Sequence, residues 1–285
     1  MLNIKLYGAK QYWCQVPRIA QGLEGLGHNT KKSDKYDLVY ANNFPYSEID
    51  NEHDDSALDN ECVKIFNVLD IPVHIPDFPL EKLQKQLSQA SIVTCISEPV
   101  KHQLFTMLNI EAHVIDNPIK EVFFDPSVNK DIDCLYVGRG TDPVKRSHLL
   151  EPLFDYMVSV GPFSGFGKHL GLVSDLVLNQ LYNRAKVVPL PSSFEGLGLT
   201  ALEAMVCGAV PLVCSDNPNA RLCPSFCICD PTQESILSKY HEILDNFDDY
   251  SQDILSQYSS KIQYRFSKFQ IAQNIINLYS KHLKK

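Results

Sequence analysis

The sequence predicts an α/β protein built on two parallel β-sheets. Short runs rich in β-branched residues recur along the chain, and patterns typical of helices lie between them. Several runs, Ala209–Cys214 among them, are apolar throughout, as expected for strands of a parallel sheet covered by helices on both faces. The series of strands stops near residue 118 and starts again after residue 131. Strand–helix alternation with one restart therefore predicts two α/β halves.

The first half contains four strand-like runs and three helical patterns. Its clearest helix start is Ser97-Glu98-Pro99, which places an N-cap candidate just before a proline near the first turn. The predicted strands are Ile4–Tyr7, Leu38–Ala41, Lys64–Val68 and Ile92–Ile96, and the predicted helices are Val16–Leu26, Leu80–Ala90 and Pro99–Leu108.

The second half repeats this alternation and adds a helix at the end of the chain. Gly208 follows one helical run directly and is a C-cap candidate. The predicted strands are Leu135–Val137, Lys186–Leu190, Ala209–Cys214 and Phe226–Cys229, and the predicted helices are Ser147–Ser159, Ser174–Ala185, Leu199–Cys207, Gln233–Asn246 and an amphipathic Ser267–Leu283.

The interruption between the halves gives the predicted domain boundary. Residues 118–131 are polar and contain Pro118 and Pro126, which are breaker signals between regular elements. We predict a Rossmann-like domain over residues 1–118 and a second one over residues 119–262. We expect the two to face each other across a cleft.

Composition excludes several classes of protein. The chain has 285 residues, 44% of them hydrophobic and 10% aromatic, so wholesale disorder is excluded. No stretch approaches the roughly 18 to 20 apolar residues of a membrane span, and the first residues enter a strand pattern without the shape of a signal peptide. Nine cysteines, mostly in apolar runs, indicate reduced thiols and a cytoplasmic protein. Cys223, Cys227 and Cys229 do not have a standard zinc spacing, and we interpret them as structural thiols with no metal site.

The net charge of −8 comes mainly from one segment. Residues 42–61 hold seven Asp and Glu and no Lys or Arg, and the rest of the chain has 26 Lys and Arg against 27 Asp and Glu. Residues 261–285 carry six bases and no acid. The overall acidity is therefore only a mild argument against a polyanionic partner.

The most informative segment is Pro191–Met205, which has the pattern of a strand end, a glycine-containing turn and a helix start. Backbone N–H groups at such a helix N-terminus lack intrahelical partners and bind phosphates or polar sugar edges. Glu195 lies in the turn and Glu203 follows eight positions later inside the helix. Helical side chains lean toward the N-terminus, so both carboxylates can serve one site and accept hydrogen bonds from sugar or ribose hydroxyls. On spacing alone, an ordinary turn with two solvated glutamates is the more frequent arrangement.

A second cluster follows the first strand of the second half. Gly138-Arg139-Gly140 ends this strand, and Lys145 and Arg146 come shortly after it. Ligands of open α/β folds bind at the carboxyl edge of the sheet. Arg139 and Lys145 could therefore bind a diphosphate and stabilise it as a leaving group. Taken alone, such a basic loop is also typical of a solvated surface.

Together the two clusters resemble retaining glycosyltransferases of family 4, which have the GT-B fold. The family's E-x7-E signature is matched within PSSFEGLGLTALEAMVCGAVPLV (residues 191–213), and its Gly-Arg with a Lys six residues later is matched by Arg139 and Lys145. Further similar stretches are QVPRIAQGLEGLGH (15–28), YDLVYAN (36–42), SIVTCISEPVKHQL (91–104) and VIDNPIKEVFFDP (114–126).

The resemblance implies a nucleotide-diphosphate-sugar donor, with a UDP-sugar favoured, and no further cofactor. Arg139 and Lys145, after Gly138, would hold the diphosphate. Glu203 would hold the ribose. Glu195 and the backbone of Gly196, Leu197, Gly198 and Leu199 would hold the sugar, and Gly8 would let the first domain approach the donor phosphates. Residues 263–285 would form a helix that crosses back to the first domain, which faces the acceptor.

One departure from the family concerns its first-domain histidine. Leu69 stands where the family commonly has a His near the sugar, and Asp70 and His74 are the candidates to replace it in catalysis. The resemblance thus implies a retaining, metal-independent hexosyl- or pentosyltransferase that acts on a hydroxyl of a glycan, a lipid-linked sugar or a small molecule. Two alternatives stay open: a phage-type DNA glycosyltransferase that modifies a hydroxymethylated base, and a catalytically silent nucleotide-sugar-binding protein.

Overall fold

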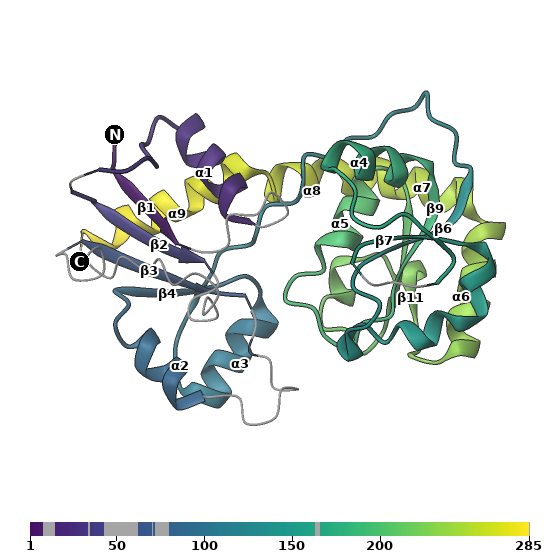
Figure 1. The fold of residues 1–285 in the computed structure, drawn as a ribbon, viewed down its shortest axis with the longest axis horizontal. Coiled ribbons are helices and arrows are strands. Elements are labelled where there is room, and N and C mark those ends of the chain that lie inside the picture. The colour runs from purple at the N-terminus through teal and green to yellow at the C-terminus, as the bar shows by residue number, and fades with distance from the viewer. Residues whose placement is uncertain are drawn as a thin grey trace. The chain divides into compact units, whose positions relative to one another are not determined.

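Two units, each built on one parallel β-sheet, make up the chain in a computed structural model (Figure 1). The structure describes residues 1–7, 15–33, 35–42, 62–69, 71, 80–162 and 166–284. The first unit comprises Met1–Pro118 and Phe266–Lys285, and the second unit comprises Ile119–Arg265. The predicted α/β class with parallel sheets is therefore confirmed.

The sheet of the first unit has its strands in chain order, β1-β2-β3-β4-β5, and all neighbours are parallel. Ser97 caps α3 as predicted, because its side chain accepts a hydrogen bond from Val100 N. The strands are β1 (Ile4–Tyr7), β2 (Leu38–Asn42), β3 (Val63–Val68), β4 (Ile92–Cys95) and β5 (His113–Val114), and the helices are α1 (Gln15–Gly25), α2 (Leu80–Leu87), α3 (Glu98–Leu108) and α9 (Lys268–His282).

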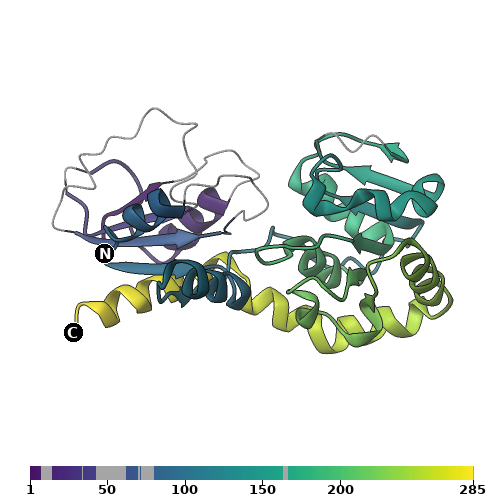
Figure 2. The same ribbon diagram turned by 90° about the horizontal axis from the view of Figure 1, so that it is seen from below.

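The last helix, α9, belongs to the first unit, so both termini of the chain lie in that unit (Figure 2). It packs against α1, and together they cover one face of the sheet while α2 and α3 lie on the other (Figure 1). The core beneath α1 and α9 contains Ile19, Leu23, Ile271 and Ile275, all fully buried.

The sheet of the second unit has the order β11-β10-β9-β6-β7-β8, and its neighbours are also parallel. Helices α4 and α5 pack on one face, and α6 and the 3₁₀ helix η3 pack on the other. The strands are β6 (Ile132–Val137), β7 (Met157–Val160), β8 (Lys168–His169), β9 (Ala185–Leu190), β10 (Val210–Cys214) and β11 (Ile228–Cys229). The helices are η2 (Pro143–Lys145), η3 (Ser147–Tyr156), α4 (Asp175–Arg184), α5 (Leu199–Val206), η4 (Ala220–Leu222), η5 (Ser225–Cys227), α6 (Gln233–Asp245), α7 (Phe247–Ile254), the π-helical turn η6 (Leu255–Ser259) and α8 (Ser260–Arg265).

The prediction of one helix over Ser147–Ser159 was wrong. The segment is a 3₁₀ helix that contains Pro152, and the chain then enters strand β7 at Met157. Proline lacks the N–H that an α-helix interior needs, and the pairing of β7 with β6 buries Met157 and Val160. Phe226 likewise lies in η5, so that only Ile228–Cys229 of the predicted strand Phe226–Cys229 pairs with β10.

The strand order reverses between β6 and β9. From β6 the chain continues to β7 and β8 on one side, and it then returns to β9, β10 and β11 on the other side. Connections on opposite sides of two neighbouring strands leave a crevice at their carboxyl ends, where open α/β sheets bind ligands. The topology therefore marks the ends of β6 and β9 as the place to look for a site.

Lys130 ties together the C-terminal ends of α4 and α5 at the amino edge of the sheet, which is the edge opposite this crevice. Its ammonium group donates hydrogen bonds to Tyr182 O (3.2 Å) in α4 and to Cys207 O (2.8 Å) at the end of α5. Burial lowers the pKa of Lys130 to about 8. The cation thus satisfies carbonyls that the helix ends leave without intrahelical partners.

Among the helices of the described chain, none has the length and hydropathy that a bilayer crossing requires. The eight cysteines in this part of the chain are thiols, and Cys227 and Cys229 are buried, as the interpretation of structural thiols expects.

We predict that Gly22→Ala destabilises the first unit. Alanine normally stabilises a helix interior by about 1 kcal/mol relative to glycine. A Cβ at Gly22, however, would lie 2.2 Å from Lys268 O and 3.1 Å from Ala272 Cβ, so α1 and α9 would have to separate. Overpacking of this kind costs about 1–3 kcal/mol. The denaturant midpoint of the variant should therefore fall, and a higher midpoint would contradict the close packing of α1 on α9.

Candidate functional site

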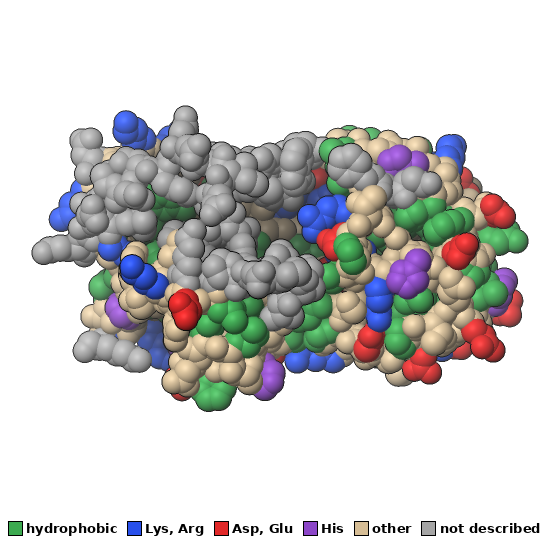
Figure 3. All heavy atoms as spheres, turned by 60° about the horizontal axis from the view of Figure 1, so that its bottom comes forward, with side chains coloured by type: hydrophobic (Ala, Val, Ile, Leu, Met, Phe, Trp, Pro, Cys, Tyr) green, Lys and Arg blue, Asp and Glu red, His purple; other side chains and the backbone are tan. Residues whose placement is uncertain are grey.

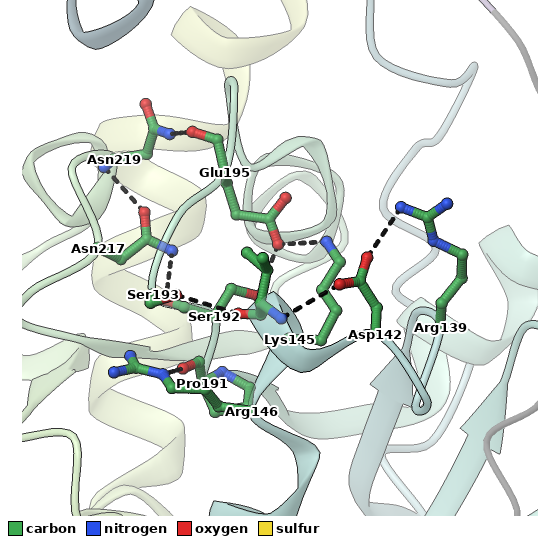
Figure 4. Close-up of polar contacts among 11 residues, drawn as sticks. Arg139, Asp142, Lys145, Arg146, Pro191, Ser192, Ser193, Glu195, Asn217 and Asn219 are labelled. Carbon is green, nitrogen blue, oxygen red and sulfur yellow. Dashed lines mark hydrogen bonds and ion pairs between the residues drawn. The ribbon is translucent and has the colours of Figure 1, made fainter. Parts of the chain in front are cut away.

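Three loops meet at the carboxyl edge of the second sheet. Residues 138–146 follow β6, residues 191–198 follow β9, and residues 215–219 follow β10. Figure 4 shows side chains of these loops pointing toward one another and joined by hydrogen bonds and ion pairs. The loops leave adjacent parallel strands at the switch point, which is why segments far apart in the sequence converge here.

Lys145 and Glu195 form the centre of this group. The Lys145 ammonium lies 2.5 Å from Glu195 Oε1, and Ser192 Oγ donates to the same oxygen over 2.7 Å. The two charged side chains are 21% and 18% exposed, so the pair is sheltered but still open to solvent. Both residues were predicted from the sequence, and the structure brings them into direct contact. A cation and an acceptor thus stand side by side.

Arg139 lies next to this pair, and its side chain is much more exposed to solvent. Its side chain is 64% exposed, and Nη2 contacts Asp142 Oδ2 over 3.0 Å. The other oxygen of Asp142 accepts from Val144 N and thereby caps η2, the short helix that ends at Lys145. Asp142 therefore orients Arg139 and, through η2, the backbone that carries Lys145.

Gly196, Leu197, Gly198 and Leu199 lead into α5. Gly198 is the N-cap of this helix with φ 69°, a left-handed conformation that favours glycine, and it has no side chain to cap the helix. The first N–H groups of a helix have no intrahelical partner and carry its positive dipole end. These N–H groups follow Glu195 along the chain, and their contact with a sugar stays a prediction.

Gly138 lies in a closely packed position between Tyr136 and Gly161. A Cβ at this position would lie 3.0 Å from the hydroxyl of Tyr136, and a Cβ at Gly161 would lie 2.2 Å from Gly138 O. Tyr136 is 2% exposed, and its hydroxyl has no hydrogen-bond partner among the described residues. Burial and the nearby Glu195 carboxylate raise the pKa of this phenol.

Glu203 lies inside α5 and is only 4% exposed. Oε1 accepts a hydrogen bond from Lys120 N over 3.0 Å, and Oε2 accepts one from the Tyr182 hydroxyl over 3.0 Å. The carboxylate therefore joins the start of the second unit to α4. The sequence missed these two partners because they lie 83 and 21 residues away along the chain.

Asparagines from the loop after β10 hold the turn that carries Glu195. Asn217 Nδ2 donates to Ser192 O over 3.2 Å, and Asn219 Nδ2 donates to Glu195 O. Asn219 N donates to Asn217 Oδ1 over 3.0 Å, so the two asparagines are also linked to each other. Both are buried. Carbonyls of an irregular turn need such partners, because no sheet or helix supplies them.

Arg146 holds the same turn from the other side. Its Nε donates to Pro191 O over 2.7 Å, and its two terminal nitrogens form a bidentate pair with Asp216 at 2.7 and 2.8 Å. The sequence assigned no role to these residues or to the two asparagines. The available signal was a cluster of short polar residues directly after the apolar strand β10.

Three of the predicted site residues, Gly8, Asp70 and His74, lie outside the described residues, as does most of the acidic segment 42–61. Within the ranges that the structure describes, no three His, Cys, Asp or Glu side chains gather closely enough to bind a metal ion.

We predict that the free energy of unfolding of Asp216→Asn falls less steeply with decreasing pH than that of the wild type. The Arg146 guanidinium holds the pKa of Asp216 below its ordinary value of 3.8. The unfolded chain therefore binds more protons than the folded chain near pH 3 to 4, and the contribution of Asp216 is lost as the pH falls through its folded pKa. Because the Asp216 side chain is 43% exposed, solvent screening keeps the effect small.

Denaturant unfolding at pH values from about 5 to about 3 measures this difference. Asp131→Asn is a matched comparison, because Arg184 also lowers the pKa of Asp131. An Asp216→Asn variant whose stability falls as steeply as that of the wild type would contradict the prediction.

A family model matches the part of the chain that contains the Glu195 turn. The family model for glycosyl transferases group 1 matches residues 168–222. The O-antigen chain mannosyltransferase B of Escherichia coli is 47% identical over 60 residues, which are 21% of this chain and 16% of that protein. The chain thus matches less than a fifth of the length of this curated relative.

Solved structures resemble the chain over nearly its whole length. HepE from Anabaena, in complex with UDP and glucose, has a TM-score of 0.74 at 15% identity and covers 99% of this chain and 100% of its own. Sucrose-phosphate synthase from Thermosynechococcus elongatus has a TM-score of 0.77 at 13% identity and covers 100% of both chains. An alpha-glucosyltransferase in complex with UDP-glucose and DNA containing an abasic site has a TM-score of 0.68 at 11% identity and covers 98% of this chain and 99% of its own. The predicted GT-B fold is thereby confirmed.

Proposed function

We propose that this protein is a retaining glycosyltransferase of family 4 that transfers a sugar from a nucleotide-diphosphate-sugar to a hydroxyl acceptor. The observation that carries the proposal is the Lys145–Glu195 pair at the switch point between β6 and β9, next to the N-terminus of α5. A cation, a carboxylate and helix N–H groups together suit a ligand that has a diphosphate and a hydroxylated sugar. The family match over residues 168–222 supports the same conclusion.

The donor's diphosphate is assigned to Arg139 and Lys145. The exposed Arg139 guanidinium can fork onto phosphate oxygens, and Lys145 supplies a point charge close to the sugar-binding carboxylate. Both cations stabilise the charge that develops on the leaving diphosphate. This charge stabilisation is the basis on which we propose a metal-independent reaction, with UDP-sugars as the favoured donors.

Transfer with retention needs attack on the face that the diphosphate leaves. The bond from the sugar's anomeric carbon to the diphosphate oxygen breaks, and a bond from the same carbon to the acceptor oxygen forms. The acceptor's proton passes to the departing phosphate oxygen. Glu195 and the 196–199 backbone orient the sugar for this step, so Glu195 is a positioning acceptor in this proposal and does not act as a nucleophile.

The ribose contact of Glu203 stays a prediction. A ribose hydroxyl would have to share a carboxylate that already accepts from Lys120 N and the Tyr182 hydroxyl. Each carboxylate oxygen has two lone pairs, so such sharing is stereochemically allowed.

The acceptor is proposed to be a hydroxyl of a glycan, a lipid-linked sugar or a small molecule. The face of the second unit drawn in Figure 3 carries acidic, basic and apolar side chains interspersed, which does not favour a polyanion. DNA remains the alternative acceptor, since an alpha-glucosyltransferase crystallised with DNA has the same fold. We propose that the reaction takes place in the cytoplasm, because nine cysteines that lie mostly in apolar runs are typical of reduced thiols.

We predict that Arg139→Ala and Lys145→Ala each weaken the binding of the nucleoside diphosphate about ten- to hundredfold, the equivalent of about 1.5–3 kcal/mol for a lost charge-assisted hydrogen bond. A thermal-shift panel of UDP, GDP and ADP first identifies the base, because a bound ligand raises the melting temperature by mass action. Calorimetry on the stabilising nucleotide then gives Kd for each variant.

The matched control is Lys186→Ala. Lys186 also forms a 2.7 Å ion pair, with Asp133, but it lies at the amino end of β9, on the opposite edge of the sheet. Its loss should leave Kd unchanged. Unchanged affinity in both Arg139→Ala and Lys145→Ala would refute the assignment of the diphosphate site.

We predict that wild-type protein slowly hydrolyses or transfers its bound donor and that Glu195→Ala loses this activity about 100-fold or more, because the sugar is no longer oriented. Release of free nucleoside diphosphate from the nucleotide-sugar selected by the thermal-shift panel measures the rate. Donor binding without any turnover, with each acceptor class supplied, would instead support the catalytically silent alternative.

A further inference from the structure

The residue directly after Lys145 has an unusual backbone. Arg146 has φ 45° and ψ 41°, and in the described chain only Arg146 and Asn109 combine a positive φ with a side chain other than glycine's. This conformation is strained for a long L-residue and unstrained for glycine. A strained residue persists only where its surroundings hold it in place, and such residues cluster at functional sites.

The side chain of Arg146 provides the contacts that hold it. Nε donates to Pro191 O over 2.7 Å, and the other two nitrogens contact both carboxylate oxygens of Asp216 at 2.7 and 2.8 Å (Figure 4 labels Arg146 and Pro191). The Arg146 side chain is only 17% exposed, so this fork is largely shielded from solvent. The planar guanidinium is needed for this geometry, which a lysine ammonium cannot reproduce.

These contacts tie together the loops after β6, β9 and β10. Arg146 belongs to the first loop, Pro191 begins the second, and Asp216 lies in the third. A backbone bond from Ser193 N to Val144 O (3.0 Å) joins the first two loops just beside Lys145. The Lys145–Glu195 pair is thus bracketed by bonds on both sides.

We propose that the Arg146–Asp216 pair is a positioning clamp that holds Lys145 against Glu195, so that the donor's diphosphate meets a cation already in place. The inference rests on the proposed function and extends it, because neither residue needs to touch the donor. The clamp acts through the backbone: it fixes the left-handed turn at Arg146 and thereby the direction in which Lys145 leaves η2. Because the loop is already ordered, the free energy of ligand binding does not have to offset the cost of ordering it.

A pair of substitutions separates this role from a purely structural one. Arg146→Gly and Arg146→Ala both remove the clamp, but only glycine relieves the backbone strain. We therefore expect the alanine variant to melt at a lower temperature than the glycine variant, while both bind the nucleoside diphosphate about tenfold more weakly than the wild type. A structural role predicts instead that affinity follows stability, with the glycine variant close to wild-type Kd.

A double-mutant cycle tests whether Arg146 acts through Lys145. In the Lys145→Ala background, Arg146→Gly should change Kd less than twofold, since the cation that it positions is gone. A further tenfold loss in that background would mean that Arg146 contacts the donor itself, and it would overturn the positioning role. Asp216→Asn should weaken binding less than Arg146→Gly, because asparagine keeps one acceptor oxygen.

Arg184→Ala is the matched control. Arg184 forms an equally close bidentate pair with Asp131 at 2.7 and 2.8 Å, but this pair lies at the amino end of β6. Its removal should leave Kd within twofold of wild type. UDP, GDP and ADP are the probes, and calorimetry is the measurement.

The outcomes also separate this inference from the proposed function. If wild-type protein binds none of the three nucleotides, both are refuted. If wild-type protein binds one of them and Arg146→Gly binds it equally well, only the clamp is refuted.

Discussion

The parallel pairing of β6 with β9 is the constraint on which the candidate site depends. The two strands are neighbours at the point where the strand order of the second sheet reverses, so their carboxyl ends open side by side. Residues 50 positions apart in the sequence, Lys145 and Glu195, are therefore brought within 2.5 Å. Neither loop alone combines the cations with Glu195, since Arg139 and Lys145 lie in the loop after β6 and Glu195 lies in the loop after β9.

The loops at this edge have irregular backbones, and their carbonyls need partners that no sheet or helix provides. Arg146, Asn217 and Asn219 supply them to Pro191, Ser192 and Glu195 in turn. These side chains come from both neighbouring loops, so the Glu195 turn is held from two sides. The arrangement also explains how a strained residue such as Arg146 persists beside the site, because its side-chain bonds stabilise a conformation that its backbone disfavours.

Much of this could be predicted from the sequence, and the reasons for the exceptions are physical. Apolar strands and capped helices have local signatures, so most elements and the capping role of Ser97 were predicted correctly. Residues 147–159 were misassigned because the prediction used only their local helical pattern. Met157–Val160 form a strand because they pair with β6, and this partner lies outside the segment. Arg139 and Glu195 were predicted as site residues because they stand next to glycines after strand ends, and Lys145 was predicted because it follows Arg139 by six residues. Arg146 and the two asparagines were missed because their importance depends on which carbonyls they reach.

The sequence by itself determined the α/β class, the alternation of elements and the residue types at the carboxyl edge, because these follow from periodicity and from the chemistry of short segments. Only the tertiary structure decided the strand order, the pairing of Lys145 with Glu195 and the burial of Glu203 against Lys120 and Tyr182. The physical reason is distance along the chain. Contacts between residues tens of positions apart depend on how strands pair and helices pack, and no local pattern encodes that choice.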